Sequence, residues 1–233
     1  MKIMSLLFLI LPSAMLSIPL VHAETTCTTA IRPAWREEFE SMPDGWKVKT
    51  KPGTRAAECG VKKNPVSDEG FLTMQADNAS ATFMVELKNI NLNKTPVLRW
   101  SWRVATFPEG ADGRVAAKDD QAIGIYVSHG GTIGQRSVAY RWETETPVGE
   151  EGSVRYAGGV VRVKWICLRN KDDGDGTQFI IEERNAAEDF KEAFGYVPDR
   201  IGIGVSCNSQ YTGSKAEAQL DWIELIAMPD GGN

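Results

Sequence analysis

The alternation of apolar and polar residues is clearest near the middle of the chain, in residues 96–104. Every second residue there is apolar, and most of the residues between them are polar. Successive side chains of a strand point to opposite faces, so the pattern predicts a central strand with one face in a core and two guanidinium groups on the other. The core-facing set is Leu98, Trp100, Trp102 and Val104, and the opposite set includes Arg99 and Arg103.

Comparable short runs recur along the chain, separated by turn signals at intervals of about 8–12 residues. They predict an all-β fold, an antiparallel two-sheet β-sandwich of the jelly-roll or lectin-like kind. One short helix is expected in the C-terminal third, because Asn185 and Glu188 form a capping-box signal and Gly195 provides a stop. Residues 107–120 and 144–158 are predicted as loops.

The tryptophans follow the same alternation and divide into two groups. Those that alternate with apolar residues are expected in the core. Trp35 and Trp46 lie near turns and are the better candidates for an exposed aromatic platform. A core position is nevertheless favoured for each of these two residues. The group expected in the core is Trp100, Trp102, Trp142, Trp165 and Trp222.

The N-terminal residues have the pattern of a secretory signal peptide. Lys2 precedes an apolar stretch from about residue 6 to 20, and Ala23 supplies a small residue for cleavage. The alternative is an uncleaved membrane anchor, but Pro12 and Pro19 interrupt the stretch. We therefore predict a signal peptide at 1–23 and a single β-sandwich domain at 24–233, periplasmic or secreted, with no membrane insertion after cleavage.

Charge narrows the range of partners. The chain has 26 Lys and Arg against 31 Asp and Glu, and its net charge is −5. An acidic chain with scattered basic residues gives no case for nucleic acid as a partner. No cofactor motif is present and no metal site is predicted, although the acidic turn at 172–175 leaves a weak calcium site as an alternative. The oligomeric state stays open.

The cysteine count suggests disulfides. An even number of cysteines in an exported chain predicts two bridges, for which three pairings exist. We favour Cys27–Cys59 and Cys167–Cys207, the second because both residues lie in predicted core strands. The absence of any C-x-x-C spacing disfavours zinc.

An ordered set of motifs resembles an exported bacterial family catalogued as domain of unknown function 3047. The resemblance covers roughly residues 35–225 and implies a β-sandwich related in shape to lectin-like and glycan-binding modules, without an established activity. Two positions depart from the family pattern, because Gly124 stands where an arginine is usual and Cys207 where an aspartate is expected. The motifs are Pro96-x-Leu98-x-Trp100-x-Trp102, Asp119-Asp120, Tyr126-Val127, Tyr140-x-Trp142, Glu183-Arg184-Asn185, Asp189-Phe190, Phe194-Gly195, Ile201-x-Ile203, Thr212-Gly213 and Asp221-Trp222-Ile223.

The outward residues of the predicted strands form a candidate ligand-binding face. If these strands are neighbours, their arginines can bind carboxylates and an aromatic ring can stack on a sugar. The alternative is a solvated sheet face in which the arginines neutralise the acids. The candidate residues are Arg99, Arg103, Asp119, Asp120, Tyr126, Arg141 and Glu143.

Three function classes follow. The sequence favours an exported, non-catalytic binding module for a glycan or another polar envelope ligand on this Arg-rich face. The first alternative is an envelope protein–protein interaction subunit. The second is a carbohydrate-active hydrolase or lyase, which needs two carboxylates ~5–9.5 Å apart, drawn from Glu143, Glu183 or the Asp119–Asp120 pair.

Overall fold

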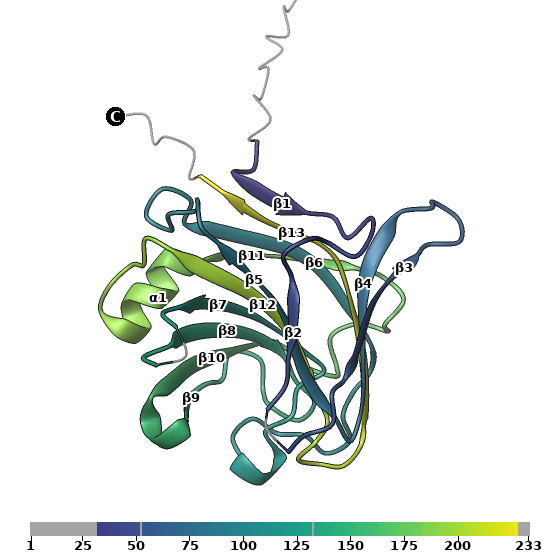
Figure 1. The fold of residues 1–233 in the computed structure, drawn as a ribbon. Coiled ribbons are helices and arrows are strands. Elements are labelled where there is room, and N and C mark those ends of the chain that lie inside the picture. The colour runs from purple at the N-terminus through teal and green to yellow at the C-terminus, as the bar shows by residue number, and fades with distance from the viewer. Residues whose placement is uncertain (1–31, 52, 132, 228–233) are drawn as a thin grey trace, which may run out of the picture. The chain divides into compact units, whose positions relative to one another are not determined.

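Two β-sheets pack face to face in the computed structural model, which describes residues 32–51, 53–131 and 133–227 (Figure 1). The described residues belong to one compact unit. Among them, no helix is long and apolar enough to cross a membrane. The predicted signal peptide and Cys27 lie outside the described residues.

The first sheet has six strands, in the order β11-β6-β13-β4-β3, with β1 also pairing with β13. The last strand of the chain, β13, therefore lies in the middle of this sheet. The strands are β1 (Trp35–Glu37), β3 (Glu58–Lys63), β4 (Gly70–Asp77), β6 (Val97–Thr106), β11 (Ile180–Asn185) and β13 (Lys215–Ile226).

The second sheet has seven strands, in the order β2-β5-β12-β7-β8-β10-β9. Strands β8 and β10 pair in parallel, while the other paired strands run antiparallel. Residues 151–156, predicted within a loop, form β9, which lies beyond β10 and runs antiparallel to it. The chain therefore reverses direction twice between β8 and β10, so that these two strands run parallel. The strands are β2 (Lys47–Lys49), β5 (Ser80–Leu87), β7 (Ile123–His129), β8 (Arg136–Trp142), β9 (Glu151–Tyr156), β10 (Val161–Arg169) and β12 (Ile201–Asn208).

Aromatic side chains of β6 and β8 join the two sheets. Trp100 and Trp102 are fully buried, as predicted, and their rings meet edge to face at 5.3 Å. Trp100 stacks on Tyr140 at 5.3 Å, and Trp102 contacts Trp142 at 5.5 Å. The two-sheet sandwich inferred from the alternation is therefore confirmed, with the parallel β8–β10 pair as its one departure from an antiparallel arrangement.

Two of the tryptophans expected in the core are not part of the inter-sheet core. Trp165 is buried in a separate small cluster on the outer face of the seven-stranded sheet, and Trp222 lies outside both clusters. The register of β13 shifts between Leu220 and Trp222, so that Asp221 is the extra residue of a β-bulge. The shift turns Trp222 to the outer face, where the guanidinium of Arg36 lies 4.4 Å from its ring centroid. Trp46, by contrast, is buried and stacks on the core residue Phe83 at 4.8 Å.

The predicted helix is present as α1 (Ala186–Phe194), which contacts β6 and β8. The side chain of Asn185 accepts a hydrogen bond from the amide of Glu188 at 3.2 Å, and Gly195 ends the helix with a left-handed φ of 83°. Two short 3₁₀ turns, Ala116–Lys118 and Ala157–Gly159, complete the helical segments of the described residues.

Replacing Asn185 with alanine is expected to lower the free energy of unfolding by about 1 kcal/mol, because the amide of Glu188 loses its cap. Urea denaturation followed by circular dichroism measures the change. Replacing the exposed Asn93, which lies outside the helix, gives the matched control, and an equal loss in both variants would contradict the capping role.

The favoured cysteine pairing is wrong for Cys167 and Cys207. Among the described residues, Cys59, Cys167 and Cys207 form no disulfide with one another. Cys167 and Cys207 lie on opposite faces of the seven-stranded sheet. Cys207 faces the core, whereas Cys167 packs in a small outer cluster with Ala139 and Trp165. Alternation within β10 and β12 shows that each cysteine is on an apolar face of its strand. It does not show whether that face meets the other sheet or lies on the outside of the sandwich. Cys27 lies outside the described residues.

Candidate ligand-binding groove

The outer face of the seven-stranded sheet carries a groove of about 490 Å³, which we call the sheet groove. Strands β5, β7, β10 and β12 supply most of the strand residues that line it, and residues with hydroxyl, amide or aromatic side chains predominate. Its charged residues are two lysines, with no acid among them. The lining residues are Lys49, Thr50, Lys51, Ser80, Thr82, Met84, Tyr126, Ser128, Gln135, Ser137, Tyr156, Val161, Val163, Gly204, Ser206, Asn208, Gln210 and Tyr211.

Small residues on β7 and β12 make the floor of the groove. A Cβ atom at Gly204 would lie 3.0 Å from Cγ2 of Thr82, and one at Gly124 would lie 3.0 Å from the ring of Tyr126. The same Cβ at Gly124 would lie 3.2 Å from the hydroxyl of Ser206. A larger side chain at either position would therefore crowd the groove, and glycine at 124 leaves room for the Tyr126 ring.

Hydrogen bonds hold the polar side chains of the floor in place. The hydroxyls of Ser128 and Ser137 lie 2.8 Å apart on adjacent strands. The buried amide of Gln121 donates to Ser206 at 2.9 Å and accepts from Asn208 at 3.3 Å. These groups are positioned before any ligand arrives, which lowers the entropy cost of binding.

Tyr211 stands at the rim on a loop that a buried acid holds in place. Asp120 has no exposed surface, and one of its carboxylate oxygens accepts from the amides of Tyr211 at 2.9 Å and Thr212 at 2.8 Å. The hydroxyl of Thr212 donates to the same oxygen at 2.9 Å. Lys51 donates to the phenol oxygen of Tyr211 at 3.1 Å. Asp120 is therefore an anchor of the rim.

A second cavity of about 440 Å³, which we call the β9 hollow, shares Tyr156 and Tyr211 with the sheet groove. The two tyrosines thus stand between neighbouring depressions. Arg114 and three acids line the β9 hollow, which makes this end more acidic than the end at β2. The acids are Asp119, Glu150 and Glu151.

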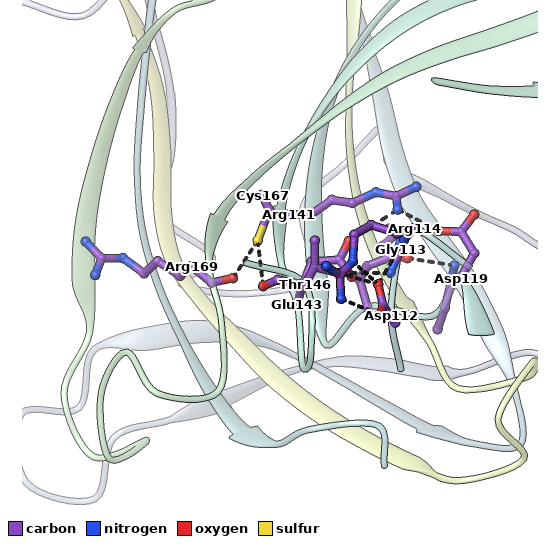
Figure 2. Close-up of polar contacts among 12 residues, drawn as sticks. Asp112, Gly113, Arg114, Asp119, Arg141, Glu143, Thr146, Cys167 and Arg169 are labelled. Atoms are coloured by element: carbon purple, nitrogen blue, oxygen red, sulfur yellow. Dashed lines mark hydrogen bonds and ion pairs between the residues drawn. The ribbon is translucent and has the colours of Figure 1, made fainter. Parts of the chain in front are cut away.

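A buried ion cluster lies beneath the β9 hollow (Figure 2). One guanidinium nitrogen of Arg141 lies 2.7 Å from Oδ1 of Asp119 and 3.3 Å from Oε1 of Glu143. Thr146 donates to the other oxygen of Glu143 at 3.1 Å. Arg141 and Glu143 are 1% and 0% exposed at their side chains, and the ring of Trp165 lies 5.3 Å from the guanidinium.

Burial sets the electrostatics of this cluster. Removal from water raises the pKa of Glu143, and the charge of Arg141 opposes that rise without cancelling it. Burial acts to lower the guanidinium pKa of Arg141, but Tyr126, Asp119 and Glu143 together outweigh it and raise that pKa. The single cation is therefore what allows two carboxylates to be buried together.

The structure divides the residues that the sequence placed on one face. Strand β6 belongs to the six-stranded sheet, so Arg99 and Arg103 lie on the outer face of the opposite sheet from Tyr126. Arg99 lies 3.2 Å from the carboxylate of Glu224, and Arg103 donates to the carbonyl of Thr177 at 2.7 Å. The expected single Arg-rich face is therefore not formed.

The other predicted residues lie on or beneath the seven-stranded sheet. Tyr126 lines the sheet groove, and Asp119 lines the β9 hollow at 6% exposure. Asp120, Arg141 and Glu143 are buried. Arg141 points outward from β8 as predicted, but the ring of Trp165 covers it. Gly113 of the long loop lies against the carboxylate of Glu143. Neither contact could be inferred from alternation.

Sequence reasoning missed Tyr156 and Tyr211. Residues 151–156 alternate and form β9, and Val154 with Tyr156 was the available signal. Tyr211 is in a loop that has no periodic pattern, and its place depends on Asp120, which is 91 residues away in the chain. No motif in the sequence identifies it.

The acidic turn considered for calcium is closed on itself. Asp175 accepts from both the amide and the hydroxyl of Thr177, at 2.9 and 2.6 Å. Asp173 accepts from the amide of Asn170 at 2.8 Å. Across 32–51, 53–131 and 133–227, no three His, Cys, Asp or Glu side chains gather as a metal site would require.

Comparisons with known proteins give distant similarities in structure and one family match in sequence. The family 11 carbohydrate-binding module of a cellulosomal cellulase from Clostridium thermocellum aligns with TM-score 0.47 and 10% identity, over 87% of this chain and 98% of that one. The xyloglucanase domain of NopAA, a type three effector from Sinorhizobium fredii, aligns with TM-score 0.45 and 11% identity, over 84% and 100%. A xylan-binding module aligns with TM-score 0.40 and 10% identity, over 82% and 95%.

Because these TM-scores are below 0.5, no functional conclusion follows from them. The chain has no significant match among curated protein sequences. The model of the family described as "Protein of unknown function (DUF3047)" matches residues 44–224, which is most of the chain. The chain therefore belongs to this family.

Proposed function

We propose that the protein is an exported, non-catalytic module that binds a glycan in the sheet groove. The observation that carries this proposal is the combination of tyrosine rings with pre-positioned hydroxyl and amide groups in one open depression. Sugars present apolar ring faces and many hydroxyls, so a site for them needs aromatic surfaces beside hydrogen-bonding groups. Detection of a chain that begins at residue 24 in a periplasmic or culture fraction tests the export.

The burial of the acids supports a binding role over catalysis. A glycosidase presents an acid and a second carboxylate to the two sides of a glycosidic bond. Here Asp119 and Glu143 share one guanidinium nitrogen of Arg141, and Glu143 has no exposed surface. Glu183, the other candidate, lies on β11 in the opposite sheet.

Replacing Tyr126 and Tyr156 with alanine together is expected to weaken glycan binding roughly 100-fold, or about 1.4 kcal/mol for each ring. The stacking surface is lost while the hydroxyl and amide groups remain. Isothermal titration against the best binder from a glycan screen measures the change.

The matched control replaces both tyrosines with phenylalanine, which keeps the rings and removes two hydroxyls. This variant is expected to retain most of the affinity. Equal affinity of the alanine variant and the unaltered protein, with both folded by circular dichroism, would reject the groove as the binding site.

A further inference from the structure

A row of lysines follows the β2 edge of the sheet groove. Lys47, Lys49 and Lys51 occupy alternate positions, and all three are exposed. Lys47 pairs with Met84 and Lys49 with Thr82 on β5, and both partners line the groove. Directly opposite residues on paired strands point to the same side, so the row faces the groove. We call these three residues the lysine row.

The lysine row has no acidic partner in the part of the chain that the structure describes. None of its ammonium nitrogens lies within 4.0 Å of a carboxylate oxygen of the described residues. Five other lysines do lie that close to an acid. The paired lysines are Lys62, Lys63, Lys164, Lys171 and Lys215.

The surroundings of the row leave its charge uncompensated on the groove side. The lining of the sheet groove contains lysines and no carboxylate, although the whole chain is acidic with a net charge of −5. Glu86 lies on the same face of β5 as Met84 but does not line the groove. Asp77 lines a neighbouring cavity with Lys51, but its carboxylate lies 3.7 Å from the ammonium group of Lys215. The acids of the β9 hollow are at the other end of the sheet groove.

We infer that the ligand of the sheet groove is an anionic glycan whose acidic groups bind at the lysine row. This inference rests on the proposed function and adds the ligand's charge. Ammonium groups on flexible stems bind carboxylates or sulfates as point charges and tolerate a varied spacing along a saccharide chain. The tyrosines hold the sugar rings. The saccharide chain is oriented by the difference in charge between the basic end of the groove at β2 and the acidic end at the β9 hollow.

Lysines on an edge strand also discourage pairing with a second sheet, and β2 is at the edge of its sheet. The two roles differ in what a substitution does. A purely protective row leaves glycan affinity unchanged when its charge is removed, whereas a binding row does not.

The test uses matched probes that differ in charge. Oligogalacturonate is compared with its methyl ester, and oligomannuronate with a mannan oligosaccharide, by isothermal titration. The variants are Lys47→Gln/Lys49→Gln/Lys51→Gln and, as a control of equal charge change, Lys62→Gln/Lys63→Gln/Lys94→Gln.

The expected result is that at least one acidic probe binds about tenfold tighter than its neutral partner, with the difference lost in the lysine-row variant and kept in the control. Raising the salt from about 20 mM to about 300 mM should weaken binding of the acidic probe and leave the neutral one unchanged.

Two results overturn the inference and are distinguishable. If the neutral and acidic probes bind equally, and both depend on Tyr126 and Tyr156, the glycan-binding function stands and the anionic ligand is rejected. If no probe binds to the folded protein, the proposed function is rejected and the inference with it.

Discussion

Replacing Arg141 with methionine is expected to lower the free energy of unfolding by about 3–5 kcal/mol. The guanidinium lies against Asp119 and Glu143, and its loss leaves two carboxylates beneath the protein surface without a cation. Methionine keeps much of the side-chain volume, so the loss reports on charge more than on a cavity. Guanidinium chloride denaturation measures it.

The loss of unfolding free energy in Arg141→Met should grow as the pH rises. The folded-state pKa of Glu143 is raised by burial, so its contribution to stability is present below the unfolded pKa and is lost as the pH rises through the folded pKa. Without Arg141 the folded pKa rises further. The variant should therefore be closer to the unaltered protein at about pH 4.5 than at about pH 8.

Two further variants distinguish the loss of the buried cation from the effect of replacing any arginine with methionine. Arg141→Met/Asp119→Asn/Glu143→Gln removes the buried charges as well and should recover a large part of the stability. Arg103→Met, on the outer face of the other sheet, should cost under about 1 kcal/mol. A loss from Arg141→Met as small as that from Arg103→Met would contradict the role assigned to the cluster.

Replacing Asp120 with alanine is expected to cost about 2–3 kcal/mol and to weaken glycan binding in addition. Its carboxylate accepts from two amides and one hydroxyl of the loop that carries Tyr211. Without it those donors lose their partner, and Tyr211 is no longer fixed at the rim. Denaturation and titration on the same variant measure the two effects.

Asp120→Asn keeps one carbonyl oxygen as an acceptor and should lose less of both stability and affinity. Asp172→Ala removes an exposed acid from a hairpin turn and serves as the charge-matched control. Binding that is unaffected in a folded Asp120→Ala protein would show that Tyr211 makes no contact with the ligand.

Strand periodicity predicted the sandwich because most of its core strands bury one face. The alternation in β6 identified Trp100 and Trp102 correctly, and the signals at Asn185 and Gly195 bounded α1. These features depend on neighbours in sequence. Trp222 was misplaced because a bulge at Asp221 reverses the alternation after it.

The candidate site was harder to predict because it depends on which strands share a sheet. Arg103 and Tyr126 both point outward, yet β6 and β7 belong to different sheets. Arg141 also points outward from β8, but the β9–β10 hairpin places Trp165 over it. Pairing between distant strands decides both outcomes, and alternation within one strand carries no information about it.

The most direct test of glycan binding in the sheet groove compares the two outer faces of the sandwich in one glycan-binding screen. The unaltered protein, Tyr126→Ala/Tyr156→Ala and Arg99→Ala/Arg103→Ala are applied to an array of neutral and acidic glycans. Glycan binding in the sheet groove predicts a signal that is lost in the tyrosine variant and kept in the arginine variant. A signal that is lost in the arginine variant and kept in the tyrosine variant would place binding on the six-stranded sheet and contradict binding in the sheet groove.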